Sequence, residues 1–240
     1  MEAWLVHAVF GVLLIIPWQS VKGIRLLDAT VVRDPNARSV FYRSAVASQW
    51  ILTLLTLAVM WSFDRGQVSA LFAGTLNADS MLIIGLASIA LMTQSPLIPA
   101  IRERMAESKS IHRTLYPIRN VLPRSKDEKQ IWVTVALTAG VCEEIIFRGF
   151  LFFYAQQMLG LGIVCAIALS SAIFAIGHIY QGTANMIRVG VVAIILGIVY
   201  AVSQNLIWCM ALHALLDLGA LYMDEFVAAD ETIVDADTDW

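Results

Sequence analysis

Charged residues are scarce in this chain. Asp, Glu, Lys and Arg make up only 15% of the 240 residues, whereas 59% are hydrophobic. A typical soluble domain carries about 25% charged residues, so the composition excludes an ordinary soluble protein. Cysteine is scarce too, and Cys142, Cys165 and Cys209 lie in apolar stretches without paired spacing. We therefore expect no disulfide framework and interpret the three thiols as small core residues.

Several recurrent sequence features are also missing. The chain has no internal repeat, no low-complexity tract and no glycine-rich phosphate loop. The first apolar segment, Trp4 to Val21, has neither a basic leader nor a small-residue cleavage site. We interpret it as a retained helix rather than a signal peptide. We expect no nucleic-acid partner.

The chain instead contains long apolar runs. A helix needs about 20 predominantly apolar residues to cross a hydrocarbon core of about 30 Å. Seven runs approach this length, at residues 4–21, 45–63, 80–100, 131–157, 161–180, 184–203 and 206–222. They predict an all-α fold: a polytopic integral membrane helical bundle with about seven transmembrane helices, placed in the inner or plasma membrane and in contact with the lipid bilayer.

Basic residues indicate how the bundle is oriented. They gather around residues 22–44, which include Arg33 and Arg38, and again around residues 101–129. Cytoplasmic loops carry an excess of Lys and Arg, so both loops should face the cytoplasm and the N-terminus should lie outside.

Ionisable residues inside the predicted spans form three local clusters. Each such residue costs about 3 kcal/mol at mid-bilayer, so it calls for a partner or a purpose. The fourth span contains Glu143, Glu144 and Arg148. The fifth contains His178, four residues after Phe174, and the seventh contains His213 and Asp217.

Helix geometry assigns partners within these clusters, because residues four apart share a face. Glu144 should face Arg148, which leaves Glu143 as an unpaired carboxylate and a candidate general base. Asp217 can either orient the His213 ring or share a water molecule with it. Gly177, next to His178, is a further candidate for close approach by another helix.

The ordered motifs Glu-Glu-x-x-x-Arg, Phe-x-x-x-His and His-x-x-x-Asp resemble those of the CPBP family. This family comprises CaaX proteases and bacteriocin-processing enzymes, including the Rce1-type prenyl-protein endopeptidases. The resemblance covers about residues 131–222. It implies that Glu143 activates water, that Phe174 lines the pocket, and that the other motif residues support the site or stabilise the transition state: Glu144, Arg148, His178, His213 and Asp217. The eukaryotic-type enzymes carry Asn at the position of Asp217.

The resemblance also divides the chain into three regions. Residues 1–130 would form N-terminal transmembrane helices and basic loops, and residues 131–222 a CPBP-like catalytic core. Residues 223–240 carry only acidic charges, which favours a disordered tail.

We expect the chain to be an intramembrane endopeptidase of the glutamate type. It would hydrolyse a peptide bond of a membrane-associated or lipidated protein or peptide by means of water activated by Glu143. A metal-free mechanism is favoured. In a second version, His178, His213 and Asp217 bind Zn²⁺ and lower the pKa of metal-bound water.

Other classes of membrane protein can use similar residues. A bis-histidine haem protein would employ His178 and His213, but it would not explain Glu143. A proton-coupled transporter or a bacteriocin immunity scaffold can use the same polar cluster without proteolysis. Depth raises one conflict: at about 1.5 Å per residue, Glu143 lies about 18 Å from the inner end of its span, but His178 only about 5 Å.

Overall fold

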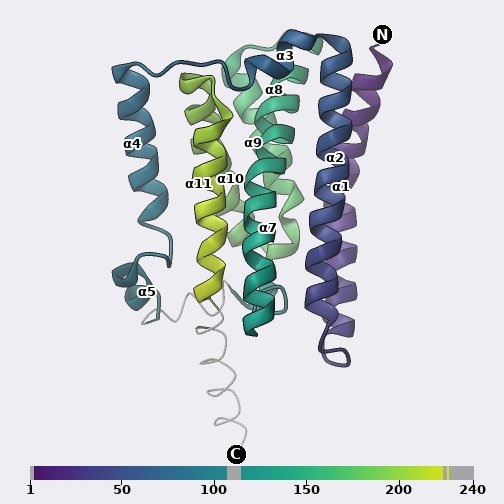
Figure 1. Ribbon diagram of the computed structural model, residues 1–240, viewed down its shortest axis with the longest axis vertical. Helices are drawn as coiled ribbons and strands as arrows, with labels where there is room; N and C mark the ends of the chain where they lie inside the picture. Colours follow the sequence, from purple (N-terminus) through teal and green to yellow (C-terminus); the bar gives the residue numbers. More distant parts are fainter. Residues whose placement is uncertain (1–2, 107–114, 224–225, 227–240) are drawn as a thin grey trace, which may run out of the picture.

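The computed structural model describes residues 3–106, 115–223 and 226, and this part of the chain is a bundle of helices without strands (Figure 1). The acidic tail predicted to be disordered lies outside the described residues except for Met223 and Phe226. The principal helices are α1 (Trp4–Thr30), α2 (Ala37–Phe63), α4 (Ala78–Met92), α7 (Lys126–Glu144), α9 (Ile163–Gly177), α10 (Thr183–Ser203) and α11 (Leu206–Leu218). Two short helices, α3 (Arg65–Ala70) and α5 (Pro99–Ala106), lie at opposite ends of the bundle.

Each predicted span overlaps one of the principal helices, and the prediction of an all-α membrane bundle is confirmed. Helices α1, α2 and α10 are long and apolar enough to cross a membrane, whereas α4, α9 and the stretch Leu206–Tyr222 are shorter apolar helices. Helix α7 continues through the π-helix η2 (Ile145–Phe150), the short α8 (Leu151–Phe153) and the π-helix η3 (Tyr154–Met158). The number of spans stays a prediction.

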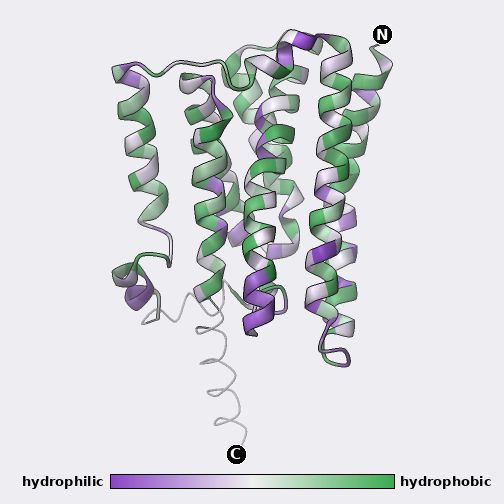
Figure 2. Cartoon of the chain, viewed as in Figure 1, coloured by the Kyte–Doolittle hydropathy of each residue, from purple (hydrophilic) through white to green (hydrophobic). Residues whose placement is uncertain are grey.

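The surface of the bundle is apolar along the helices. Leu54, Ile89 and Val164 are 60%, 64% and 74% exposed, respectively. Hydrophilic residues gather near the bundle ends, in α5 and the N-terminal parts of α2 and α7 (Figure 2). An exposed apolar surface of this extent suits contact with lipid tails rather than with water.

Two of the predicted boundaries were wrong. The first basic loop was placed at residues 22–44, but helices α1 and α2 cover most of it and leave a turn at residues 31–36. The break comes where Asp34 precedes Pro35, because a residue before proline avoids the helical region. The third predicted span also ends early, at Met92, shortly before the Ser95-Pro96 step.

The start of α7 is held by a capping box. The Ser125 hydroxyl accepts a hydrogen bond from the Glu128 backbone N–H, and the Glu128 carboxylate accepts from the Ser125 N–H in return. Arg38 from α2 lies 3.5 Å from the same carboxylate. Burial would raise the pKa of Glu128, but the backbone N–H bonds and the Arg38 guanidinium outweigh burial and leave this pKa below its ordinary value.

Helix α2 makes further contacts along the length of α7 and its continuation. The Tyr42 hydroxyl donates to the Val121 carbonyl at 2.7 Å, and the Tyr42 ring meets Trp132 edge-on. At the other end of both helices, Phe63 packs edge-on against Phe153. The two helices therefore run side by side in the same direction (Figure 1).

A glycine brings α7 and α11 together. A Cβ atom placed on Gly140 would lie 2.8 Å from the Ala214 Cβ and 2.9 Å from the Met210 carbonyl oxygen. The close approach expected at Gly177 is not found, since a Cβ there would meet nothing within 4 Å. Gly140 thus sets the contact that places the end of α7 beside the middle of α11.

Candidate active site

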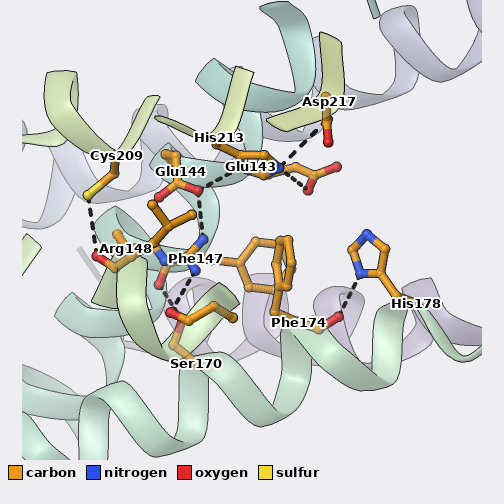
Figure 3. Close-up of polar contacts among 12 residues, drawn as sticks. Glu143, Glu144, Phe147, Arg148, Ser170, Phe174, His178, Cys209, His213 and Asp217 are labelled. Atoms are coloured by element: carbon orange, nitrogen blue, oxygen red, sulfur yellow. Dashed lines mark hydrogen bonds and ion pairs between the residues drawn. The ribbon is translucent and has the colours of Figure 1, made fainter. Parts of the chain in front are cut away.

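The ionisable residues singled out in the sequence come from the end of α7, from η2, from the residue after α9 and from α11 (Figure 3). The structure joins five of them into a cluster of hydrogen bonds and ion pairs: Glu143, Glu144, Arg148, His213 and Asp217. His178 lies beside the cluster and is connected to it through Phe174. These contacts are geometry, and the catalytic roles of the residues stay predictions.

Glu144 is the centre of this cluster. Its carboxylate is fully buried, and its Oε1 atom lies 2.7 Å from Arg148 Nη1 and 2.7 Å from His213 Nδ1. The Arg148 guanidinium is itself buried and donates a second hydrogen bond, from Nη2, to the Ala193 carbonyl of α10 at 2.9 Å. Three helices are therefore connected through one ion pair.

The backbone changes from α-helix to π-helix immediately after Glu144, at the start of η2. A π-helix moves hydrogen bonds from the fourth to the fifth residue and is often found at functional sites. The Ser170 hydroxyl of α9 donates to the Phe147 carbonyl within this segment at 2.7 Å. The irregular backbone is thus supported from the neighbouring helix.

His213 is oriented by Glu144 rather than by Asp217. A carboxylate only accepts hydrogen bonds, so His213 Nδ1 must carry the proton in the 2.7 Å contact. The other ring nitrogen, Nε2, lies 3.7 Å from Asp217 Oδ2 and 3.8 Å from Glu143 Oε2. Both distances are too long for direct hydrogen bonds.

Glu143 is not the unpaired carboxylate that the sequence predicted. Its Oε1 atom accepts a hydrogen bond from Gln49 Nε2 at 2.8 Å, and Gln49 comes from α2. Gln49 was not among the predicted site residues, because its carboxamide is neutral and the candidates were ionisable residues and their neighbours. A carboxamide in an otherwise apolar run was the signal that would have found it.

His178 follows the last residue of α9. Its Nδ1 atom lies 2.8 Å from the Phe174 carbonyl oxygen, so Nδ1 carries the proton and neutral Nε2 is the accepting nitrogen. The Phe174 ring packs against the rings of His178 and His213, with centroid distances of 4.6 and 5.8 Å. Figure 3 shows the His178 ring extending from the end of α9 toward Glu143 and Asp217.

These contacts resolve the conflict in depth between Glu143 and His178. Helix α7 begins at Lys126, before the predicted start of its span, and α9 already ends at Gly177. A Cβ atom placed on Gly190 would lie 3.3 Å from the Ala175 Cβ, so these two residues lie at the same level. Helix α10 begins at Thr183, seven residues before Gly190, whereas α9 ends at Gly177, two residues after Ala175, so α9 ends short of its neighbour. The helices therefore start and end at different levels, so the distance from a predicted span boundary does not give the relative depth of Glu143 and His178.

The alternative zinc set is not assembled. Within residues 3–106 and 115–223, no three His, Cys, Asp or Glu side chains converge on a point that would hold a metal ion. The predicted ligands His178, His213 and Asp217 therefore do not form a metal site in this arrangement.

Comparison with known families gives a match over residues 128–219. This segment matches the family model described as type II CAAX prenyl endopeptidase Rce1-like. The matched range contains the three motifs and excludes α1 to α5. No curated protein and no solved structure matches the chain.

Proposed function

Because residues 128–219 form an Rce1-like domain, as the motifs indicated, we propose that this membrane protein is an intramembrane endopeptidase in which Glu143 activates the attacking water. The substrate would be a membrane-associated or lipidated protein or peptide, and the enzyme would be a multi-pass protein of the inner or plasma membrane. The observation that carries the proposal is the approach of Glu143 Oε2 and Asp217 Oδ2 to the same nitrogen, His213 Nε2, at 3.8 and 3.7 Å.

The arrangement supports a division of roles. A water molecule near Glu143 Oε2 would lose a proton to this carboxylate and attack the carbonyl carbon of the substrate. The resulting oxyanion needs a hydrogen-bond donor, which protonated His213 can supply through Nε2, whereas His178 Nε2 is an acceptor and would hold the attacking water. Glu143 would then pass the proton to the departing amine as the C–N bond breaks.

The remaining residues would hold this geometry. Glu144 fixes the tautomer of His213 and is itself neutralised by Arg148. Phe174 is 3% exposed and lies against both imidazole rings, so it would form an apolar wall beside the scissile bond. Asp217, whose side chain is 36% exposed, is the most exposed of the three acids in the cluster and would also bind the attacking water.

The other functional alternatives have less support. A haem between His178 and His213 would need the space that the Phe174 ring occupies beside both histidines. The proposed mechanism is the metal-free version that the sequence analysis favoured. A transporter or an immunity scaffold would not need the base and oriented imidazole that Glu143 and His213 provide.

The proposal is tested by comparing the wild type with Glu143→Gln. Membrane-protein C-termini would be quantified by proteomics in cells that express either form, and candidate peptides would then be cleaved by purified enzyme with and without lipidation. We expect Glu143→Gln to abolish cleavage and to remain folded, because Gln keeps the shape but cannot take the proton. Glu103→Gln, an exposed acid on α5, is the matched control. A cleavage-competent Glu143→Gln enzyme would refute the proposed base.

A further inference from the structure

A single carboxamide interrupts the apolar part of α2. Gln49 is the only Asn or Gln in Ala37–Phe63 and is followed by Trp50, Ile51 and further apolar residues. The Gln49 side chain is half-buried. A carboxamide facing lipid loses the hydrogen bonds that it makes in water, so it is stabilised there only by a protein partner.

The partner of Gln49 is the proposed base. Gln49 Nε2 lies 2.8 Å from Glu143 Oε1, although the two residues are 94 positions apart in the chain. A carboxylate has no proton to give, so the Gln49 amide N–H must be the donor. Gln49 lies outside the segment that matches the Rce1-like family, which begins at residue 128.

We infer that Gln49 is a positioning residue for Glu143: its amide N–H holds Oε1 of the carboxylate and thereby directs Oε2 toward His213 Nε2. The distances of 2.8 Å on one side and 3.8 Å on the other are consistent with one anchored oxygen and one oxygen left for water. The expected effect of Gln49 on turnover rests on the proposed function of Glu143 as the base.

A second consequence concerns the charge of Glu143. A hydrogen bond donated to a carboxylate favours the ionised form, which is the form that acts as a base. The charged or titratable groups near Glu143 come from three stretches of the chain: Cys142, Glu144 and Arg148 from α7 and η2, His213 and Asp217 from α11, and His178 and Tyr180 after α9. Helix α2 contributes only the neutral Gln49. Removal of this donor should therefore make Glu143 retain its proton to a higher pH.

A purely structural hydrogen bond between α2 and α7 would behave differently. Its loss would lower stability and would reduce turnover by the same factor at every pH. The loss of a positioning residue should instead displace the acidic limb of the pH profile, so that turnover recovers as the pH is raised, and KM should change little.

The test uses Gln49→Met in the full-length protein, because Met keeps the length of the side chain and removes the N–H donor. Gln49→Asn is the second variant, since its amide is one methylene too short to reach. Ser48→Ala is the matched control: the Ser48 hydroxyl is exposed and bonds only the Ala45 carbonyl of its own helix. Turnover and KM would be measured from acidic to alkaline pH.

A measurement that does not need activity accompanies the kinetics. Infrared difference spectroscopy follows the band of the protonated Glu143 carboxyl group during a pH titration, and Glu143→Gln identifies this band by its loss. Both Gln49 variants should move the midpoint upward by about one to two pH units, the size expected for one hydrogen bond to a charged group. Ser48→Ala should leave it in place.

The possible outcomes distinguish the proposed function from the positioning role of Gln49. If the wild type cleaves no peptide but the midpoint still moves in both Gln49 variants, the proposed function fails and the positioning of Glu143 stands. If the wild type is active and neither the midpoint nor the acidic limb moves in folded Gln49 variants, the inference about Gln49 is wrong while the proposed function stands.

Discussion

Glu144 shows how one buried side chain can connect the helices of the candidate site. Its carboxylate is fully buried and uses Oε1 for both Arg148 and His213, while Oε2 has no hydrogen-bond partner among the described residues. A buried ion pair is costly to assemble, but the removal of one member is costlier, because the other charge is left uncompensated.

The first prediction at this scale concerns Glu144→Gln. The substitution leaves the Arg148 guanidinium without its anion in a fully buried position, and it weakens the hold on the His213 ring. We expect a loss of about 3–5 kcal/mol in stability, together with reduced turnover at every pH. Thermal unfolding of the purified protein in detergent measures the loss, with the exposed Glu103→Gln as control. Unchanged stability in Glu144→Gln would show that the pair does not bear on folding.

This effect distinguishes the two neighbouring acids. Glu143→Gln should stop cleavage in a protein that stays folded, whereas Glu144→Gln should damage the fold first. The sequence predicted this division from the pairing of Glu144 with Arg148, and the structure places these two side chains 2.7 Å apart. It adds His213 as a second partner of Glu144, which helix periodicity within one segment cannot reveal.

At the scale of helices, the contact between α7 and α11 decides whether the site can form. Gly140 lies one turn before Glu143, and the closest atoms to a Cβ at this position belong to Met210 and Ala214, which flank His213 in α11. Small residues allow the backbones of membrane helices to approach closely. The same contact therefore brings the carboxylates of α7 and the imidazole of α11 within reach of each other.

The substitution Gly140→Ala should disturb the packing of α7 against α11. The added methyl group would lie 2.8 Å from the Ala214 Cβ and 2.9 Å from the Ala214 backbone nitrogen, so the helices must move apart. We expect a loss of about 1–3 kcal/mol from overpacking and a marked fall in turnover.

The matched control for this substitution is Gly85→Ala in α4. A Cβ atom there meets nothing within 4 Å, and alanine is the better helix former, so stability should stay the same or rise slightly. Equal melting temperatures for the two variants would mean that the close approach at Gly140 does not restrict the packing of α7 and α11.

At the scale of the whole molecule, the two ends of the bundle differ in charge. The turn between α1 and α2 carries Arg33, and the nearby start of α7 carries Lys126 and Lys129. Helix α3 lies at the opposite end of the bundle (Figure 1). The excess of basic residues on cytoplasmic loops predicts that the α1–α2 turn faces the cytoplasm and α3 faces outside.

Cysteine labelling tests this orientation. Val32 is 88% exposed in the turn, and Ser69 is exposed on α3, so each can be replaced by Cys in a background where the exposed Cys165 is changed to Ser. Cys142 and Cys209 are buried and can remain. In intact cells, an impermeant reagent should label Ser69→Cys, and it should label Val32→Cys only after permeabilisation. The reverse pattern would invert the topology.

Sequence alone determined the features that depend on local geometry and on the solvent. Apolar runs predicted the helices because a chain in lipid must satisfy its backbone hydrogen bonds internally, and the spacing of four residues predicted that Glu144 faces Arg148. The ends of the helices could not be predicted from hydropathy: α1 continues nine residues past its apolar run, to Thr30, whereas α4 ends at Met92, before Pro96, although its apolar run continues.

Only the tertiary structure decided how the segments meet. The Gln49–Glu143 and Glu144–His213 contacts join residues 94 and 69 positions apart. Neither residue type nor spacing encodes such contacts, because they arise from the rotation, depth and close approach of separate helices. The depth of His178 likewise depends on where α9 ends relative to α7. The sequence therefore named most residues of the candidate site, and helix packing decided which atoms of those residues face each other.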